Sequence, residues 1–324
     1  MPRVLLTDPI DASGEALLRA RGAEVVLAPE GSSATVKRLA AEADGVIIRS
    51  KLPDDIFEAA PRLRAVTIHG TGTDLVPLAS ANAKGVLVAN LPGENAQSVA
   101  EYCVLAMLML ARDIAAITAA MHTRPWDEAR RLAASAREIA GLTVGIVGVG
   151  EIGRRVAQIC ARGFGMRVLG NQRRMDRLPP EAQGADLDPL IAQSDFVVLA
   201  CPLTRETHHL FNAARLGAMK SSAWLINVGR GPVIDEAALI AALGKKRIAG
   251  AMLDVYEHYR IEAGHPLLAL DNVLLTPHLA GSTRESRARA SVRAADETLR
   301  MLAGEKPRNL VNPEAWHARR PENR

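Results

Sequence analysis

The stretch Leu142-Thr-Val-Gly-Ile-Val-Gly-Val-Gly-Glu-Ile-Gly153 predicts a strand, a tight turn and the start of a helix. Residues 142–147 are apolar and rich in β-branched side chains, and an amphipathic helix follows over 154–162. In Gly148-x-Gly150-x-x-Gly153, the first glycine permits the turn, the second lets backbone approach a pyrophosphate, and the third lets the helix pack on the strand. With a second strand at 166–170, this favours a dinucleotide site at the helix N-terminus over an ordinary Gly-rich turn.

The chain on both sides of this stretch alternates short apolar strands with helices. This alternation predicts parallel α/β layers. The strand candidates before the stretch are 3–7, 24–27, 45–48, 65–68 and 85–88, and those after it are 195–200, 223–227, 248–253 and 272–276.

The length and the helix pattern predict two domains. A chain of 324 residues usually divides. Residues 98–121 predict one long helix, apolar almost all round, which we expect to be covered between domains or at a subunit interface. Residues 130–140 predict a connecting helix, and residues 282–302 a final helix that returns to the first domain. We expect a discontinuous first domain (1–97 plus 283–324), a dinucleotide-binding domain (98–282) and a cleft between them.

The composition argues against several other classes of protein. The net charge is +4, but the basic residues are scattered and aromatic residues make up only 3%, which disfavours nucleic acid as a partner. Three unevenly spaced cysteines favour neither a disulfide framework nor a zinc site, and we expect no bound metal. The apolar run 99–110 is too short to span a bilayer, and the N-terminus does not resemble a signal peptide, so we expect a cytoplasmic protein without a membrane partner.

Three polar side chains follow successive strands near the end of the predicted nucleotide fold. Arg230 lies between two glycines, Asp254 follows the next strand, and His278 follows Pro277 after the last. Ligands bind beyond the carboxyl ends of parallel strands, so these residues should converge on one edge. We therefore favour Arg230 as a ligand of an anion or carbonyl over a solvated loop arginine, and His278 as a site residue over a capping or core histidine.

Five motifs together resemble the D-2-hydroxyacid dehydrogenases, which include glyoxylate/hydroxypyruvate reductases and phosphoglycerate dehydrogenases. The motifs are Gly148–Gly153, Asn227–Gly231, Leu253–Tyr256, His265–His278 and Asn95–Glu101. The resemblance implies a Rossmann-like and a flavodoxin-like parallel-sheet domain, and hydride exchange between a nicotinamide and C2 of a small 2-keto or 2-hydroxy acid. It also implies that Arg230 binds the substrate carboxylate and polarises the keto oxygen, while His278 is the general acid in reduction.

The resemblance implies further contacts to substrate and cofactor. Backbone N–H groups of His69, Gly70, Thr71 and Gly72 would bind the substrate carboxylate as a small nest. Arg49 would reach the far end of the substrate, although a plain surface charge is an equally good interpretation. The implied cofactor contacts are Gly148, Gly150, Glu151, Ile152, Gly153, Gln172, Arg173, Arg174, Cys201, Pro202, Thr207, Val228, Gly229, Asp254 and Gly281.

The chain departs from the family pattern at the partner of the histidine. The family usually has a carboxylate five residues after the aspartate of this motif, and here Tyr259 takes that position. Because a phenol brings no negative charge, we expect Tyr259 to orient His278 and the pKa of His278 to be lower than in relatives with the carboxylate. Alternatively, Glu257 or Glu262 takes the place of the family carboxylate beside His278. The departure also leaves open a catalytically weak nucleotide-sensing or corepressor protein.

A second departure concerns the choice of cofactor and substrate. Gln172 stands where NAD enzymes place an acidic residue for the ribose 2′-OH, and Arg173 and Arg174 follow it. This pattern predicts NADP(H) over NAD(H), although surface arginines in an indifferent enzyme would look the same. Ile68 replaces the arginine typical of phosphoglycerate dehydrogenases, which favours an unphosphorylated acid over phosphoglycerate. The apolar 98–121 segment favours a homodimer.

Overall fold

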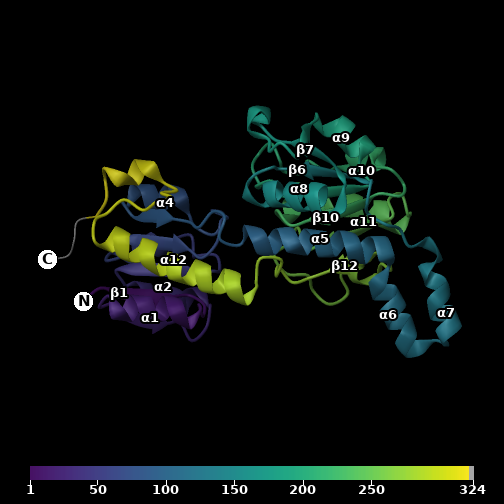
Figure 1. Ribbon diagram of the computed structural model, residues 1–324. Coiled ribbons are helices and arrows are strands. Elements are labelled where there is room, and N and C mark those ends of the chain that lie inside the picture. Colours follow the sequence, from purple (N-terminus) through teal and green to yellow (C-terminus); the bar gives the residue numbers. More distant parts are fainter. Residues whose placement is uncertain (321–324) are drawn as a thin grey trace. The chain divides into compact units, whose positions relative to one another are not determined.

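The computed structural model describes residues 1–320, which form two compact units. Unit 1 contains Met1–Asn95 together with the chain from Ser282 onward, and unit 2 contains Ala96–Gly281 (Figure 1). The last four residues of the predicted C-terminal segment, 321–324, lie outside the described residues.

Unit 1 is built on a five-stranded parallel sheet. Its strand order, β2-β1-β3-β4-β5, is that of flavodoxin-like folds. The strands are β1 (Arg3–Leu6), β2 (Glu24–Leu27), β3 (Gly45–Ile48), β4 (Ala65–Ile68) and β5 (Leu87–Ala89). The helices are α1 (Ala12–Ala20), α2 (Ser33–Ala40), α3 (Ile56–Ala59), α4 (Leu78–Ala83) and α12 (Arg284–Leu302). Two apolar clusters of unit 1 contain its buried strand residues.

The C-terminal helix α12 is an integral part of unit 1. It begins with a capping box, in which the Thr283 side chain accepts from the Ser286 N–H while Ser286 accepts from the Thr283 N–H. It packs closely on α1, since a Cβ at Gly14 would lie 2.6 Å from the Ser291 carbonyl oxygen. Beyond α12, an antiparallel bridge joins Leu310 to Ala89 at the end of β5. The tail 309–316 therefore belongs to unit 1.

Unit 2 is built on a seven-stranded parallel sheet in the order β12-β11-β10-β9-β6-β7-β8. The strands are β6 (Thr143–Val147), β7 (Arg167–Asn171), β8 (Gln183–Gly184), β9 (Phe196–Leu199), β10 (Trp224–Asn227), β11 (Gly250–Leu253) and β12 (Val273–Leu275). The order reverses between β6 and β9, which makes this the switch point where ligands bind in such sheets. The predicted α/β class with two parallel sheets is confirmed.

The helices of unit 2 include one that starts directly after the glycine turn. They are α5 (Ala96–Arg112), α6 (Ile114–Thr123), α7 (Trp126–Arg131), α8 (Glu151–Phe164), α9 (Leu187–Gln193), α10 (Ala213–Ala218) and α11 (Glu236–Gly244). Helix α8 buries Val156, Ala157 and Cys160 in the same apolar cluster as β6.

Two helix predictions in unit 2 were wrong. The helix predicted over 98–121 is two helices, because Asp113 takes a left-handed conformation (φ 49°) and bends α5 against α6 by 57°. The helix predicted over 130–140 begins earlier, as α7, and ends in a short 3₁₀ turn over Leu132–Ser135. Pro125 is the N-cap of α7 and directly precedes its first helical residue, Trp126.

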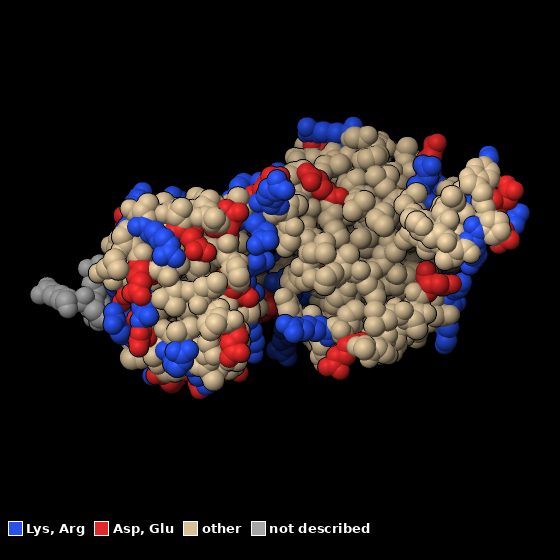
Figure 2. Space-filling model, turned by 90° about the horizontal axis from the view of Figure 1, so that it is seen from below, with Lys and Arg blue, Asp and Glu red and all other residues tan. Residues whose placement is uncertain are grey.

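Within residues 1–320 no single helix combines the length and apolar character of a membrane span, and α5 with α6 meets that measure only as a bent pair. Figure 2 shows one face of the molecule, on which basic and acidic residues are interleaved over unit 1.

Candidate active site

The glycine turn after β6 has the steric features that its sequence predicts. Gly148 has a positive φ of 94°, and a Cβ there would lie 2.5 Å from the Cys201 backbone nitrogen. A Cβ on Gly153 would lie 2.3 Å from the Gly148 carbonyl oxygen, so any side chain would push α8 away from the turn. Gly148 therefore joins the ends of β6 and β9 at the switch point, while Gly153 fixes the contact between helix and strand.

The amino end of α8 fits the pyrophosphate of a dinucleotide. A Cβ on Gly150 would meet no heavy atom within 4 Å, so the space beside this residue is open. No side chain caps the helix at Gly150, which leaves N–H groups of the first turn to an outside acceptor. Glu151 and Ile152 form that first turn. An open cradle beside uncapped N–H groups is what a phosphate requires.

The loop after β7 is rich in guanidinium groups. The Gln172 side chain donates to the Arg174 carbonyl at 2.8 Å, and Arg173 and Arg174 are exposed. Arg154, on α8, donates to the carbonyl of Arg177 in this loop at 3.1 Å. Sequence reasoning missed Arg154, although its position one residue after Gly153 in the first turns of the helix was a usable indication. The predicted residues and Arg154 thus surround one loop at the end of β7.

In the loop after β9, Cys201 lies beside the glycine turn, and Pro202 and Thr207 follow it in the chain. The Thr207 hydroxyl donates to the Pro202 carbonyl and accepts from the Thr204 N–H, each at 2.7 Å, so this loop is closed by its own polar groups. Cys201 is buried, and burial raises the pKa of its thiol to about 11. The thiol therefore stays protonated near neutral pH and brings no negative charge to this loop.

Arg230 is fixed by the glycines on either side of it. A Cβ on Gly231 would lie 1.7 Å from the Tyr256 carbonyl oxygen, and one on Gly229 would lie 2.7 Å from that of Cys201. The Asn227 side chain secures the same turn, because it accepts from the Gly229 N–H and donates to the Arg230 carbonyl, both at 3.0 Å. The backbone of Arg230 therefore has little freedom relative to the ends of β9 and β11. Val228 precedes this turn directly after β10.

Asp254 anchors the loop that carries His278. Its buried carboxylate accepts from the Thr276 hydroxyl (2.7 Å), the Leu279 N–H (2.7 Å) and the Ala280 N–H (2.9 Å). The Asp254 carbonyl accepts from the His278 N–H at 3.0 Å. His278 has a left-handed backbone (φ 53°), which costs a non-glycine residue about 1 kcal/mol or more and persists only where its surroundings enforce it. Asp254, predicted as a cofactor contact, supplies that enforcement.

Tyr259 contacts His278, whereas Glu257 has a different partner. The Tyr259 and His278 rings meet edge to face with centroids 5.7 Å apart, and Tyr259 as a residue is 69% exposed. Glu257 lies instead against His209, with 3.4 Å between the carboxylate and the ring nitrogen. The alternative in which Glu257 replaces the family carboxylate at His278 is therefore not the arrangement in this structure. Gly281, the last residue of unit 2, follows the anchored loop.

In unit 1, the predicted substrate residues follow β3 and β4. Arg49 donates to the Pro9 carbonyl at 3.4 Å, and the His69 ring hydrogen-bonds the Ser291 hydroxyl of α12 at 2.8 Å. Burial, followed by the charge of Arg49, lowers the pKa of His69 to about 4. His69 is therefore a neutral hydrogen-bonding group near pH 7.

The predicted nest at 69–72 is already partly occupied. The His69 N–H donates to the Ile48 carbonyl and the Gly70 N–H to the Ile68 carbonyl, both at 2.8 Å. Neither Gly70 nor Gly72 is among the positive-φ glycines, although alternating left-handed residues are typical of a nest. The N–H groups of Thr71 and Gly72 are the remaining candidates in this loop.

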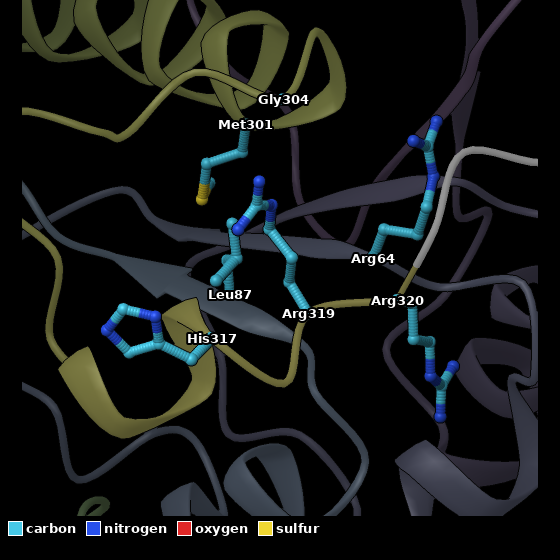
Figure 3. A pocket seen from close by; sticks show the side chains of 7 residues that line it. All are labelled: Arg64, Leu87, Met301, Gly304, His317, Arg319 and Arg320. Carbon is cyan, nitrogen blue, oxygen red and sulfur yellow. The ribbon is translucent and has the colours of Figure 1, made fainter.

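A cavity of about 400 Å³ in unit 1 lies at the opposite ends of the strands (Figure 3). Arg64 and Leu87, in its lining, stand at the starts of β4 and β5. The Arg320 guanidinium is committed to backbone carbonyls, including those of Ala60 and Leu63 at 2.9 Å. The Arg319 guanidinium stacks on the Trp316 ring at 4.4 Å. These cations secure the C-terminal tail, and the cavity is not the candidate site.

Comparisons with known proteins agree with this geometry. The family model described as D-isomer specific 2-hydroxyacid dehydrogenase, NAD binding domain, matches residues 104–280. A glyoxylate reductase of Thermofilum pendens is 37% identical, over 84% of this chain and 82% of that protein. A glyoxylate/hydroxypyruvate reductase B of Klebsiella pneumoniae is 38% identical, over 85% of this chain and 86% of its own.

A solved structure is similar over almost the whole chain. It is the NADPH-dependent glyoxylate/hydroxypyruvate reductase of Sinorhizobium meliloti in complex with NADP and malonate. The TM-score is 0.84 at 28% identity, and the match covers 99% of both chains. Together with the glycine turn and the anchored histidine loop, these matches show that the chain is an oxidoreductase with a nicotinamide-binding unit and belongs to the D-isomer-specific 2-hydroxyacid dehydrogenases.

Proposed function

We propose that the protein reduces a small unphosphorylated 2-keto acid, such as glyoxylate or hydroxypyruvate, with NADPH. The observation that carries this proposal is the Asp254 anchor. Its four hydrogen bonds hold His278 in a left-handed conformation at the end of β12, two strands from Arg230 at the end of β10. A guanidinium on a constrained turn and an imidazole on an anchored loop, both at one sheet edge, are the two groups that reduction of a keto acid needs.

Each residue has a defined task in this proposal. The bound dihydronicotinamide supplies the hydride to C2 of the substrate. Arg230 binds the substrate carboxylate and draws electron density onto the keto oxygen, and His278 donates a proton to that oxygen. The ring of Tyr259 packs against the His278 imidazole and orients it. In unit 1, Arg49 and the N–H groups of Thr71 and Gly72 bind the rest of the acid.

The preference for NADPH is supported by the loop after β7. Gln172 offers a neutral amide where a carboxylate would repel a 2′-phosphate, and Arg173, Arg174 and Arg154 bring guanidinium groups to the same loop. The relative from Sinorhizobium meliloti is named as NADPH-dependent. Changing Gln172→Asp should lower the NADPH/NADH ratio of kcat/KM about tenfold or more, because the new carboxylate repels the phosphate and accepts from a ribose hydroxyl.

The substrate proposal is tested by a panel of keto acids with both cofactors. We expect glyoxylate and hydroxypyruvate to be turned over with NADPH, and 3-phosphohydroxypyruvate to react poorly because Ile68, at the end of β4, is buried and carries no charge. His278→Asn should lower kcat about 10²-fold or more without loss of cofactor binding. Preferred turnover of the phosphorylated acid would instead indicate a phosphoglycerate dehydrogenase.

A second candidate, a nucleotide-sensing binding protein, is favoured by one observation. Tyr259 brings no negative charge to His278 and is largely exposed. Such a protein would bind the cofactor, measured by fluorescence titration, but would consume none of it with any acid in the panel.

We also propose that the protein forms a homodimer through α5, α6 and α7. Large apolar side chains on these helices are exposed, including Leu105 (49%), Ile114 (46%), Met121 (49%) and Trp126 (57%). An apolar surface of this kind on consecutive helices is typical of an interface between copies of one chain.

A further inference from the structure

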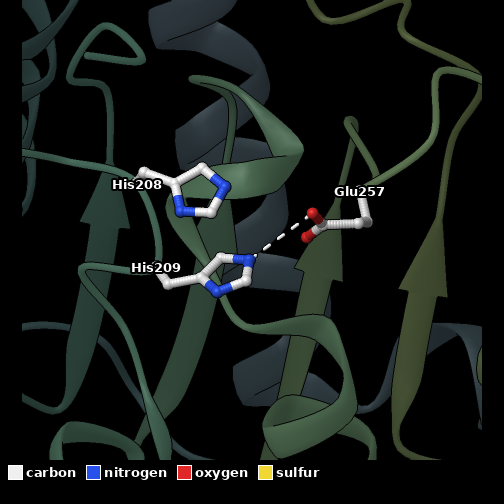
Figure 4. A group of neighbouring side chains, drawn as sticks. All are labelled: His208, His209 and Glu257. Atoms are coloured by element: carbon white, nitrogen blue, oxygen red, sulfur yellow. Dashed lines mark hydrogen bonds and ion pairs between the residues drawn. The ribbon is translucent and has the colours of Figure 1, made fainter. Parts of the chain in front are cut away.

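Three side chains from two loops of unit 2 form a cluster that the proposed reaction does not use. His208 and His209 belong to the loop after β9, and Glu257 belongs to the loop after β11. One ligand atom from each residue, a ring nitrogen or a carboxylate oxygen, lies within 4.8 Å of the other two. Figure 4 shows the two imidazoles one above the other, with the carboxylate facing them from the neighbouring loop.

An unusual backbone conformation brings both imidazoles to one side. Side chains of adjacent residues in extended chain point in opposite directions. His209 has a left-handed φ of 49°, and the two rings are stacked with centroids 4.0 Å apart and planes 25° apart. The His209 N–H donates to the Pro232 carbonyl at 2.8 Å, which holds this conformation. The loop thus presents two imidazoles as a pair.

The Glu257 carboxylate is incompletely satisfied where it stands. One oxygen is 3.4 Å from the His209 ring nitrogen, longer than the 2.7–2.9 Å that is typical of a charge-assisted hydrogen bond. The other oxygen is buried and has no hydrogen-bond partner. The backbone of Glu257 is fixed, because its N–H donates to the Glu236 carboxylate at 3.1 Å and Gly231 packs against it. A buried carboxylate oxygen without a partner is costly, and a cation would satisfy it.

We propose that His208, His209 and Glu257 bind a divalent transition-metal ion of the zinc class. Zinc takes imidazole nitrogen and carboxylate oxygen at 2.0–2.2 Å, which separates neighbouring ligand atoms by about 3.4 Å in a tetrahedral site. The pair His209–Glu257 already has that separation of 3.4 Å. The His208 ring is exposed and its ligand atom lies within 4.8 Å of the other two, so a change of its side-chain rotamer would complete the set. Magnesium and calcium, which prefer oxygen ligands, fit this donor set poorly.

Binding of the ion would join two loops that the proposed reaction also uses. Thr207, a predicted cofactor contact, directly precedes His208, and Tyr259 follows Glu257 by two residues. The ion is therefore expected to raise the thermal stability of the protein. This inference concerns binding alone and stands whether or not the protein reduces keto acids.

The test is a titration of chelator-treated protein with Zn²⁺ in competition with a chromophoric chelator. We expect one ion per chain, and an affinity at least tenfold lower in Glu257→Gln and in His209→Gln. The EPR spectrum of Cu²⁺ bound in place of zinc should show coupling to two imidazole nitrogens. Thermal unfolding with and without Zn²⁺ gives a readout that is independent of catalysis.

The matched control is His258→Gln, which removes an exposed imidazole next to Glu257 but outside the cluster. Its affinity for Zn²⁺ should equal that of the unchanged protein. Because His209 has a left-handed backbone, its variant risks misfolding, and His208→Gln then serves in its place. The proposal is overturned if Glu257→Gln and His208→Gln both bind Zn²⁺ as tightly as the unchanged protein. It is also overturned if only His258→Gln loses binding.

Discussion

At the scale of single residues, the carboxylate of Asp254 determines where His278 stands. Asp254→Asn keeps the shape of the side chain but places an NH₂ group where an N–H of Leu279 or Ala280 now donates. We expect the free energy of unfolding to fall by about 1–3 kcal/mol and kcat to fall as the histidine loop moves. Urea denaturation and steady-state kinetics measure both. The control is Asp271→Asn, which changes an acid whose side chain is 80% exposed. Identical results for the two variants would contradict the role of Asp254 as the anchor of the His278 loop.

His69 makes the stability of unit 1 depend on pH. Its pKa is about 4 in the folded chain, lowered mainly by burial, against an ordinary value of 6.5. Between these values the unfolded chain binds more protons, so the free energy of unfolding rises with pH. Acidification from neutral pH to pH 4 lowers it by up to about 3 kcal/mol. His69→Gln should flatten this dependence in chemical denaturation between pH 7 and pH 4.5, whereas the exposed His122→Gln should leave it unchanged.

At the scale of elements, the contact between α8 and the glycine turn depends on the absence of a side chain at Gly153. Gly153→Ala would place a Cβ 2.3 Å from the Gly148 carbonyl oxygen, so the helix must move. We expect cofactor affinity to fall about tenfold or more, together with the melting temperature. Gly163→Ala is a control on the same helix, because its Cβ meets nothing within 4 Å and alanine favours helix by about 1 kcal/mol. Both variants are compared by fluorescence titration and thermal unfolding.

The strands were predictable from the sequence, but the division of residues 98–121 into helices α5 and α6 was not. Strands buried on both faces are short continuous apolar runs, and β3 and β4 have the predicted bounds. The helix was predicted to continue through Asp113, although aspartate is disfavoured inside helices and adopts the left-handed conformation more readily than most residues. Strand β8 is only two residues long and was missed.

The order of the site residues was predictable for the same topological reason. Parallel neighbours put Arg230, Asp254 and His278 at one edge of the sheet, and β10, β11 and β12 are indeed adjacent. What these side chains contact was not predictable. The sequence did not indicate that the Asp254 carboxylate binds the histidine loop, and its contact with the cofactor stays a prediction. The pairing of Glu257 with His209 depends on loop conformation, which spacing does not encode.

At the scale of the whole molecule, the exposed apolar side chains of α5–α7 predict the oligomeric state. Leu105→Glu places a charge in the proposed interface, so we expect the variant to be monomeric in analytical ultracentrifugation with an unchanged circular dichroism spectrum. Leu27→Glu is the matched control, since Leu27 in unit 1 is 45% exposed against 49% for Leu105. A dimer that survives Leu105→Glu but dissociates with Leu27→Glu would place the interface elsewhere.

The split of unit 1 along the chain also sets an order of events during biosynthesis. Its first 95 residues leave the ribosome without α12, whose Ser291 and Thr298 side chains hydrogen-bond His69 and Thr67. At 5–20 residues per second, the roughly 200 residues in between take about 10–40 s to make. Unit 2 is made during that interval and its chain is complete before α12, while the nascent N-terminal sheet exposes the apolar face that α12 later covers. Chaperones that bind nascent chains should therefore crosslink to β3 and β4 until translation passes residue 302.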